Sequence, residues 1–212
     1  MADMQKLYDA ILNGDNKTAV AITQEALQDK VDPMELITKY MVPAMDEVGK
    51  RFECEEYFVP ELLLSARAMK GSLGLLRPLL AEQGAQPVGR VVIGTVKGDL
   101  HDIGKNLVSS MLEGGGFEVV DLGADVSAEK FIEAVRTKGA NIVCLSALLT
   151  VTMPAMKTII EALKAAGIRD QVKVLVGGAP LTKQFADQIG ADGYGESASS
   201  AVRLARSLSA KN

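Results

Sequence analysis

The chain has 212 residues, of which 48% are hydrophobic and 24% charged, as in an ordinary globular protein with one large or two small domains. Its 23 Lys and Arg against 27 Asp and Glu give a formal net charge of −4, which argues against nucleic acid as a partner. The single histidine, His101, excludes metal cages and zinc fingers that require several imidazoles.

Neither the cysteines nor the first residues suggest export or membrane insertion. Residues 1–6 are not followed by the apolar core of a signal peptide, and no run of 18 apolar residues could span a membrane. Cys54 and Cys144 lie far apart and form neither a C-x-x-C motif nor a disulfide framework, which suits a reducing compartment. We therefore expect a cytoplasmic protein, with Cys144 as a buried structural thiol.

The first 86 residues are predicted to form a four-helix bundle. The helices are expected around residues 7–11, 19–27, 33–48 and 60–80. Asn13-Gly14-Asp15 separates the first helix from the second, and Asp32-Pro33 is a start signal for the third. Pro43 lies inside this third helix and should kink it. The short connections favour an antiparallel arrangement of the four helices.

The second half alternates short apolar runs with helical patterns. Strands are expected near Val91–Thr95, Glu118–Leu122, Ile142–Ser146, Lys173–Val176 and Asp192–Tyr194. Helices are expected at Ile103–Leu112, Ala128–Thr137, Pro154–Ala165, Thr182–Ile189 and Ser197–Leu208. Five such units predict a flavodoxin- or Rossmann-like, doubly wound α/β domain over residues 87–212, with a parallel five-stranded sheet. The linker is placed at residues 83–87, and the charge divides accordingly, with net −5 over residues 1–89 and net +1 over 90–212.

Sheets of this kind bind ligands beyond the carboxyl ends of their strands, which directs attention to the loop after the first strand. The segment 97–105 is neither a phosphate-binding P-loop nor a G-x-G-x-x-G motif. Its notable feature is Asp99-x-His101, because a carboxylate at this spacing can hold one ring nitrogen while the other meets a metal or acts as a base. The alternative is a solvated surface histidine.

Two further loops are candidates for ligand contact. Ser146–Thr152 follows the third strand and is rich in hydroxyl groups, which could bind a polar ligand or cap the helix that begins at Pro154. Gly177-Gly178 follows the fourth strand and would allow the backbone to approach a ligand, or simply form a tight turn. Gly114–Gly116 lies at the opposite end of the sheet and is interpreted as a helix end without a ligand role.

Together these loops resemble the cobalamin-binding signature D-x-H-x-x-G … S-x-L … G-G. The segment 94–107 resembles the corrinoid-binding module of cobalamin-dependent methionine synthase, and equally the small corrinoid proteins of methylamine, methanol and betaine methyltransferase systems. Segments 48–52 and 57–67 resemble the helical cap of those proteins. The resemblance to a methyltransferase cognate corrinoid protein therefore covers essentially the whole chain, with a cap over residues 1–86.

The resemblance implies a role for each matching residue. His101 would be the lower axial ligand of cobalt, Asp99 would hold its imidazole, and Thr152 would extend this relay where the family often has Ser. The residues implied in binding the cofactor are Gly98, Asp99, Leu100, His101, Asp102, Gly104, Ser146, Leu148, Thr150, Gly177, Gly178 and Ala198, with Phe52 and Val59 of the cap covering its upper face. Methionine synthase has Leu in place of Val59.

The implied function is that of a corrinoid carrier, one component of a methyltransferase system rather than a complete enzyme. Cobalamin or a related corrinoid would cycle between its methyl-cobalt and cobalt(I) states. The implied partners are a substrate:corrinoid methyltransferase, a second methyltransferase acting on tetrahydrofolate or a thiol, and a reductive activating protein. The alternatives are a cobalamin-binding regulator, the cobalamin subunit of a mutase, and a flavodoxin-like enzyme that uses Asp99 and His101 in acid–base catalysis.

Overall fold

The computed structural model describes residues 2–82, 84 and 88–209. The chain divides into two compact units, one comprising residues 1–87 with Glu113–Gly116 and the other residues 88–112 with 117–212. We call them the helical unit and the sheet unit. The predicted linker 83–87 and the domain boundary between residues 86 and 87 fall on positions that, apart from residue 84, lie outside the described residues.

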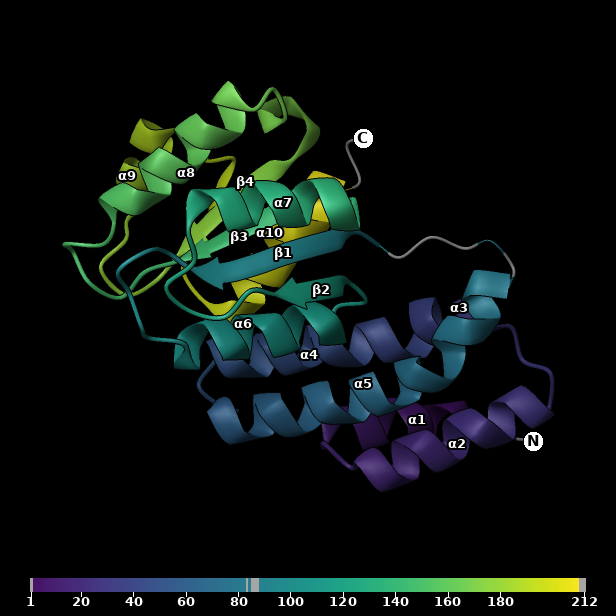
Figure 1. The fold of residues 1–212 in the computed structure, drawn as a ribbon. Coiled ribbons are helices and arrows are strands. Elements are labelled where there is room, and N and C mark those ends of the chain that lie inside the picture. Colours follow the sequence, from purple (N-terminus) through teal and green to yellow (C-terminus); the bar gives the residue numbers. More distant parts are fainter. Residues whose placement is uncertain (1, 83, 85–87, 210–212) are drawn as a thin grey trace. The chain divides into compact units, whose positions relative to one another are not determined.

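The helical unit contains the predicted bundle (Figure 1). Its elements are α1 (Met4–Leu12), α2 (Asn16–Gln28), α3 (Pro33–Leu36), η1 (Ile37–Met41), α4 (Val42–Glu53) and α5 (Val59–Glu82). Helix α2 packs along α5, and α1 packs against α2 and α4. Leu7 and Ile11, four residues apart on α1, are fully buried, as their spacing predicts. Among the described residues, none of the helices combines the length and apolarity needed to cross a bilayer.

The third predicted helix is divided in the structure. One π-helical turn, η1, separates the short helix α3 from α4, and the N–H of Val42 bonds to the carbonyl of Ile37 five residues earlier. Pro43 follows at once and has neither an N–H to donate nor room for an ordinary preceding turn, so the wider π turn replaces the simple kink expected from sequence. Helix α4 continues through Gly49 and ends at Glu53.

The sheet unit confirms the predicted doubly wound α/β fold. Its strands are β1 (Arg90–Thr95), β2 (Glu118–Asp121), β3 (Ile142–Ser146), β4 (Lys173–Gly177) and β5 (Gly193–Gly195). Its helices are α6 (Ile103–Gly114), α7 (Ala128–Lys138), α8 (Pro154–Ala165), η2 (Arg169–Gln171), α9 (Lys183–Ile189) and α10 (Ala198–Ser209). All neighbouring strands are parallel, in the order β2-β1-β3-β4-β5.

Both faces of this sheet are covered, which explains why its strands are continuous apolar runs. Val92, Val143 and Val174 point into a core shared with α7, α8 and α9. The alternate residues Val91 and Ile142 are equally buried but belong to the other face. In Figure 1, α7 lies in front of the sheet and α10 passes behind it.

The strand register places the candidate loops side by side. Thr95, the last residue of β1, pairs with Ser146, the last of β3, and Ser146 pairs with Gly177 at the end of β4. Since β2 and β3 flank β1 on opposite sides, the chain reverses its direction of winding at β1. The loops after β1 and β3 therefore diverge from the switch point at which such folds bind ligands.

Candidate functional site

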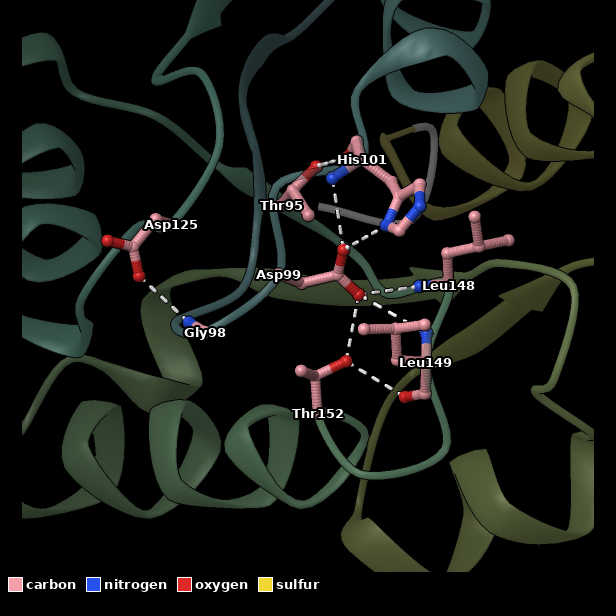
Figure 2. Close-up of polar contacts among 8 residues, drawn as sticks. All are labelled: Thr95, Gly98, Asp99, His101, Asp125, Leu148, Leu149 and Thr152. Atoms are coloured by element: carbon pink, nitrogen blue, oxygen red, sulfur yellow. Dashed lines mark hydrogen bonds and ion pairs between the residues drawn. The ribbon is translucent and has the colours of Figure 1, made fainter.

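His101 lies in the loop between β1 and α6, at the carboxyl edge of the sheet (Figure 2). The hydroxyl of Thr95, at the end of β1, donates to the backbone oxygen of His101 at 2.8 Å and ties the loop back to its strand. The imidazole itself remains accessible, with 53% of the side chain exposed. The loop is thus fixed while its histidine faces solvent.

The carboxylate of Asp99 is fully buried and accepts five hydrogen bonds. Its Oδ1 accepts from the backbone N–H of His101 at 3.1 Å and from the ring Nδ1 at 3.0 Å. Its Oδ2 accepts from the backbone N–H of Leu148 at 2.8 Å, from that of Leu149 at 3.3 Å and from the Thr152 hydroxyl at 2.8 Å. One side chain therefore joins the loops after β1 and β3, and brings together the three residues expected to form the relay (Figure 2).

These contacts decide which nitrogen of His101 is free. Burial alone would raise the pKa of the Asp99 carboxyl, but the hydrogen bonds from Leu148, His101 and Thr152 outweigh it and hold that pKa well below its ordinary range. An ionised carboxylate can only accept, so the ring nitrogen facing it, Nδ1, carries a proton. The Nε2 of a neutral ring is then left with a lone pair, and it has no hydrogen-bond partner among the described residues.

Large apolar side chains are exposed in the loops after β1 and β3 and at the first residue of α6, at the same edge of the sheet as His101. They are Leu100, Ile103, Leu148, Leu149 and Val151. Their exposed fractions reach 78% for Leu100, 81% for Val151 and 85% for Ile103. A concentration of such side chains at one edge of a sheet marks a surface that another group covers.

The paired glycines after β4 allow a close backbone approach. Gly178 has φ 136, and a Cβ at this position would lie 1.9 Å from the carbonyl oxygen of Ala147. A Cβ on Gly177 would lie 3.0 Å from the carbonyl oxygen of Gly195. Gly178 therefore lets the loop after β4 pass directly against the loop that supplies two amides to Asp99.

The other predicted residues lie at the same edge or in the other unit. Gly98, Leu100, Asp102 and Gly104 belong to the loop and first turn of α6 that carry His101. Ser146 ends β3, Thr150 is exposed in the loop beyond it, and Ala198 begins α10. Phe52, in α4, and Val59, at the start of α5, belong to the helical unit, so their place over the cofactor stays a prediction.

Three contacts of the site were not anticipated from the sequence. Thr95 anchors His101, and Leu149 donates a second backbone N–H to Asp99. Asp125, in the loop after β2, holds the backbone beside Asp99. A backbone donor leaves no trace in residue type, but Asp125 is a polar residue after a strand and could have been considered by the rule that led to the other loops.

The residues present fit a corrinoid, the cofactor implied by the resemblance. A corrin ring supplies four nitrogen ligands to its own cobalt, so the protein needs to add one. The lone pair on Nε2 of His101 meets that need, and the exposed apolar residues around it offer a surface for the flat macrocycle. No three His, Cys, Asp or Glu side chains in the described part of the chain gather as ligands of a bare metal ion.

Comparison with protein families agrees with this fit. A family described as "B12 binding domain" matches residues 89–203, and a second family with the same description matches residues 4–77. The two matches together include the loops of the sheet unit and nearly all of the helical unit.

Individual relatives extend over the whole chain. Trimethylamine corrinoid protein 1 of Methanosarcina acetivorans is 45% identical over 96% of this chain and 95% of its own length. The dimethylamine corrinoid protein of Methanosarcina barkeri is 44% identical over 97% of this chain and 96% of its own length. Among solved structures, a cobalamin-binding protein from Desulfitobacterium hafniense superposes with TM-score 0.80 at 32% identity, covering 96% of this chain and 97% of its own. A chain of the methanol:cobalamin methyltransferase complex of Methanosarcina barkeri superposes with TM-score 0.85 at 31% identity, covering 99% of this chain and 80% of its own length.

Proposed function

The chain belongs to the B12-binding family of corrinoid proteins, and on that premise we propose that it carries a methyl group on a bound corrinoid between two methyltransferases. The observation that supports this most directly is the His101 ring, held by Asp99 through Nδ1 so that Nε2 is free to bind a metal. A bound corrinoid supplies a cobalt atom that accepts a methyl group and gives it up again.

The chain's own residues would bind and orient this cofactor. His101 would bind the metal through Nε2, and Asp99 would hold the proton on Nδ1 and fix the ring's direction. The Thr152 hydroxyl would restrain the far oxygen of Asp99. Gly177 and Gly178, which the resemblance implies in binding the rest of the cofactor, lie at the same edge beyond β4.

The helical unit is proposed to cover the methyl-bearing face. Phe52 is half-buried and Val59 is 42% exposed, so at least Val59 offers apolar surface for the purpose. Apolar cover would exclude water from the reactive bond. It would also have to move when a partner enzyme reaches the same face.

The proposed partners follow from the need to load, unload and repair the carrier. One methyltransferase loads the methyl group from its substrate, and the identity to methylamine corrinoid proteins favours a methylated amine as donor. A second methyltransferase removes the methyl group to tetrahydrofolate or a thiol. A reductive activating protein restores cobalt that has been oxidised by accident. Cys54 and Cys144 are free thiols, which favours the reducing cytoplasm as the location of the protein.

A visible spectrum of the corrinoid-loaded protein tests the axial ligand. We expect the wild-type spectrum to show a nitrogen ligand on cobalt, and His101→Ala to lose that signature. Added imidazole should restore it in His101→Ala, since a small ligand can occupy the space of the missing ring. Asp170→Ala, at an exposed position of η2 before the amino end of β4, is the control. An unchanged spectrum in His101→Ala would refute the assignment.

Methyl transfer itself is tested with the reduced carrier. The protein with cobalt(I), a methylated amine and the partner methyltransferase from the same genome should form methyl-cobalt, read from the change in the visible spectrum. Tetrahydrofolate or a thiol with the second enzyme should reverse the change. Formation of methyl-cobalt with methanol but not with an amine would overturn the proposed donor and leave the carrier function intact.

A further inference from the structure

The loop after β2 runs beside the loop that carries Asp99, and hydrogen bonds join the two. The N–H of Thr95 donates to the carbonyl of Gly123 at 2.9 Å, and the N–H of Val126 donates back to the carbonyl of Thr95 at 3.0 Å. A parallel bridge pairs Val96 with Val126 beyond the ends of both strands. The segment that leads to Asp99 therefore has a neighbour on the side of β2 as well as on the side of β3.

Asp125 makes the last and closest of these contacts. Its Oδ1 accepts from the backbone N–H of Gly98 at 2.8 Å, and its Oδ2 pairs with the ammonium group of Lys97 at 3.0 Å. Its own N–H donates to the backbone carbonyl of Asp99 at 2.9 Å. Asp125 thus holds the backbone on both sides of the Gly98–Asp99 step.

The backbone of Asp125 adopts an unusual conformation to reach both groups. Its φ is 54, in the left-handed region that residues other than glycine rarely enter, although Asp and Asn tolerate it best. Gly98 opposite it also has a positive φ, 85. Two neighbouring segments therefore depart from ordinary conformations at the point where they bond to each other.

We propose that Asp125 is a positioning residue of the cofactor site, one that fixes the backbone of Asp99 and through it the direction and tautomer of His101. This inference rests on the proposed binding of a corrinoid by His101. The side chain of Asp99 is held by the loop after β3 and its backbone by Asp125, so the carboxylate has one position from which to meet Nδ1. Figure 2 places Asp125 on the side of Asp99 away from the imidazole, so it acts without touching His101.

Asp192 offers a matched control elsewhere in the same unit. Its N–H donates to the carbonyl of Val174 at 2.7 Å, its Oδ2 accepts from the N–H of Val174 at 2.6 Å, and it pairs with Arg169 at 2.8 Å. These are the kinds of contact that Asp125 makes, but they lie at the amino end of β4, at the opposite edge of the sheet from His101. Loss of Asp192 should weaken the unit without disturbing the site.

Four variants separate the proposed role from general stability. Asp125→Gly removes the carboxylate and accepts the positive φ, so it tests the side chain without backbone strain. Asp125→Asn keeps an oxygen for Gly98 and tolerates the same φ, so it should act as the wild type. Asp192→Gly removes the comparable contacts of the control. Asp125→Ala serves as a second loss-of-contact variant.

The single histidine of the chain makes the readout unambiguous. In the full chain without corrinoid, nitrogen NMR of ¹⁵N-labelled histidine reports the tautomer of His101 alone. We expect the Nδ1–H form to dominate in the wild type, Asp125→Asn and Asp192→Gly. In Asp125→Gly and Asp125→Ala the population should move toward the Nε2–H form, because the acceptor at Nδ1 is no longer held. The corrinoid-loaded Asp125→Gly variant should also bind its cobalt through nitrogen about tenfold less well, as when a residue that supports a metal ligand is lost.

The inference is overturned if Asp125→Gly keeps the wild-type tautomer, or if Asp192→Gly shifts it equally. Folded and unfolded chains give separate histidine signals, so the tautomer is read from the folded population even where a variant is partly unfolded. The NMR measurement needs no cofactor. A wild-type tautomer in Asp125→Gly would therefore refute the role of Asp125, whereas an unchanged spectrum in loaded His101→Ala would refute the proposed function.

Discussion

Asp99 determines the chemistry of the site more than any other single residue. A fully buried carboxylate is unfavourable unless its oxygens are satisfied, and here five hydrogen bonds satisfy them. Two of these bonds come from His101, whose orientation therefore depends on a charge that the fold must keep ionised. The carboxylate that joins the two loops is thus the same group that holds the proton on Nδ1 and leaves Nε2 of His101 free to bind a metal.

Thr152 tests how much one of these bonds contributes. Its hydroxyl lies 2.8 Å from Oδ2 of Asp99 and also 2.8 Å from the carbonyl of Leu149. Thr152→Val keeps the shape but leaves Asp99 with one donor fewer, so we expect the free energy of unfolding to fall by about 1–3 kcal/mol. Thr152→Ser keeps the hydroxyl and should lose less. Urea unfolding of both variants measures the difference, and a loss in Thr152→Ser as large as that in Thr152→Val would contradict the larger contribution expected of the hydrogen bond.

Acid should remove the contribution of Asp99 to stability. Because its pKa is lower in the folded chain than the value of about 3.9 in an unfolded one, its stabilising effect is complete above about pH 4 and is lost as the pH falls further. Asp99→Asn removes this titration. The wild type should therefore be more stable than Asp99→Asn at pH 7, and its advantage should shrink below about pH 4. Urea unfolding from pH 7 to pH 3 measures it, and an advantage that stays constant across this range would contradict the assignment.

The elements themselves were largely predictable, because buried parallel strands are short apolar runs between clear breaks. The strands β3 and β1 lie within one residue of their predicted bounds, and α8 matches exactly the range Pro154–Ala165. The π turn before Pro43 was not predictable, since the sequence shows that a proline disturbs the helix but not how the chain adjusts.

The site was predictable where side chains carry the signal. Asp99, His101 and Thr152 have characteristic types and spacings, and the structure brings them together. The amides of Leu148 and Leu149 carry no such signal, because any residue type supplies an N–H. The sequence places Asp125 after a predicted strand, but its contacts depend on pairing that continues beyond the ends of β1 and β2, which residue type does not indicate.

Gly178 is required by the contact between the ends of β3 and β4. Gly178→Ala would place a Cβ 1.9 Å from the carbonyl oxygen of Ala147, in a backbone conformation that side chains rarely adopt. We expect this change to lower the free energy of unfolding by at least about 1–3 kcal/mol, the usual magnitude for such backbone strain alone. Gly167→Ala, with φ 70 but nothing within 4 Å of its Cβ, is the control for strain without collision. Equal losses in the two variants, measured by thermal unfolding, would show that the close approach at Gly178 is unimportant.

Gly104 is expected to behave in the opposite way. It lies in α6 without a positive φ, and a Cβ there would meet nothing within 4 Å. Gly104→Ala should therefore raise the stability of the corrinoid-free chain by roughly 0.5–1 kcal/mol, as for alanine in a helix. If the corrinoid lies close to this turn, the same change should weaken its binding, measured by titration of the visible spectrum. Binding equal to that of the wild type would show that the cofactor does not approach Gly104.

At the scale of the whole molecule, the exposed apolar side chains are distributed unevenly. Five of those in the described residues lie after β1 and β3, at the edge of the sheet that carries His101, namely Leu100, Ile103, Leu148, Leu149 and Val151. Five more lie in the helical unit, at Met34, Phe58, Val59, Leu63 and Leu64, four of them within residues 58–64. A chain without its cofactor keeps these surfaces in water, so its stability should depend on corrinoid concentration.

Corrinoid binding should raise the thermal transition of the sheet unit. At a free concentration one hundred times the Kd, a ligand that binds only the folded state adds about 2.7 kcal/mol, which for a chain of this size corresponds to about 5–10 °C. Val151→Asp should weaken binding and reduce the shift, while leaving the transition of the corrinoid-free chain nearly unchanged, because this side chain is 81% exposed.

Val88→Asp provides the comparison for that measurement. Val88 is 45% exposed and precedes β1 at the amino edge of the sheet, so a charge there should leave both the corrinoid-free transition and the shift as in the wild type. Differential scanning calorimetry at increasing corrinoid concentration follows both variants. If corrinoid raises the thermal transition of Val151→Asp as much as that of the wild type, the macrocycle does not contact Val151. The exposed apolar side chains after β3 would then need another explanation than cover by the cofactor.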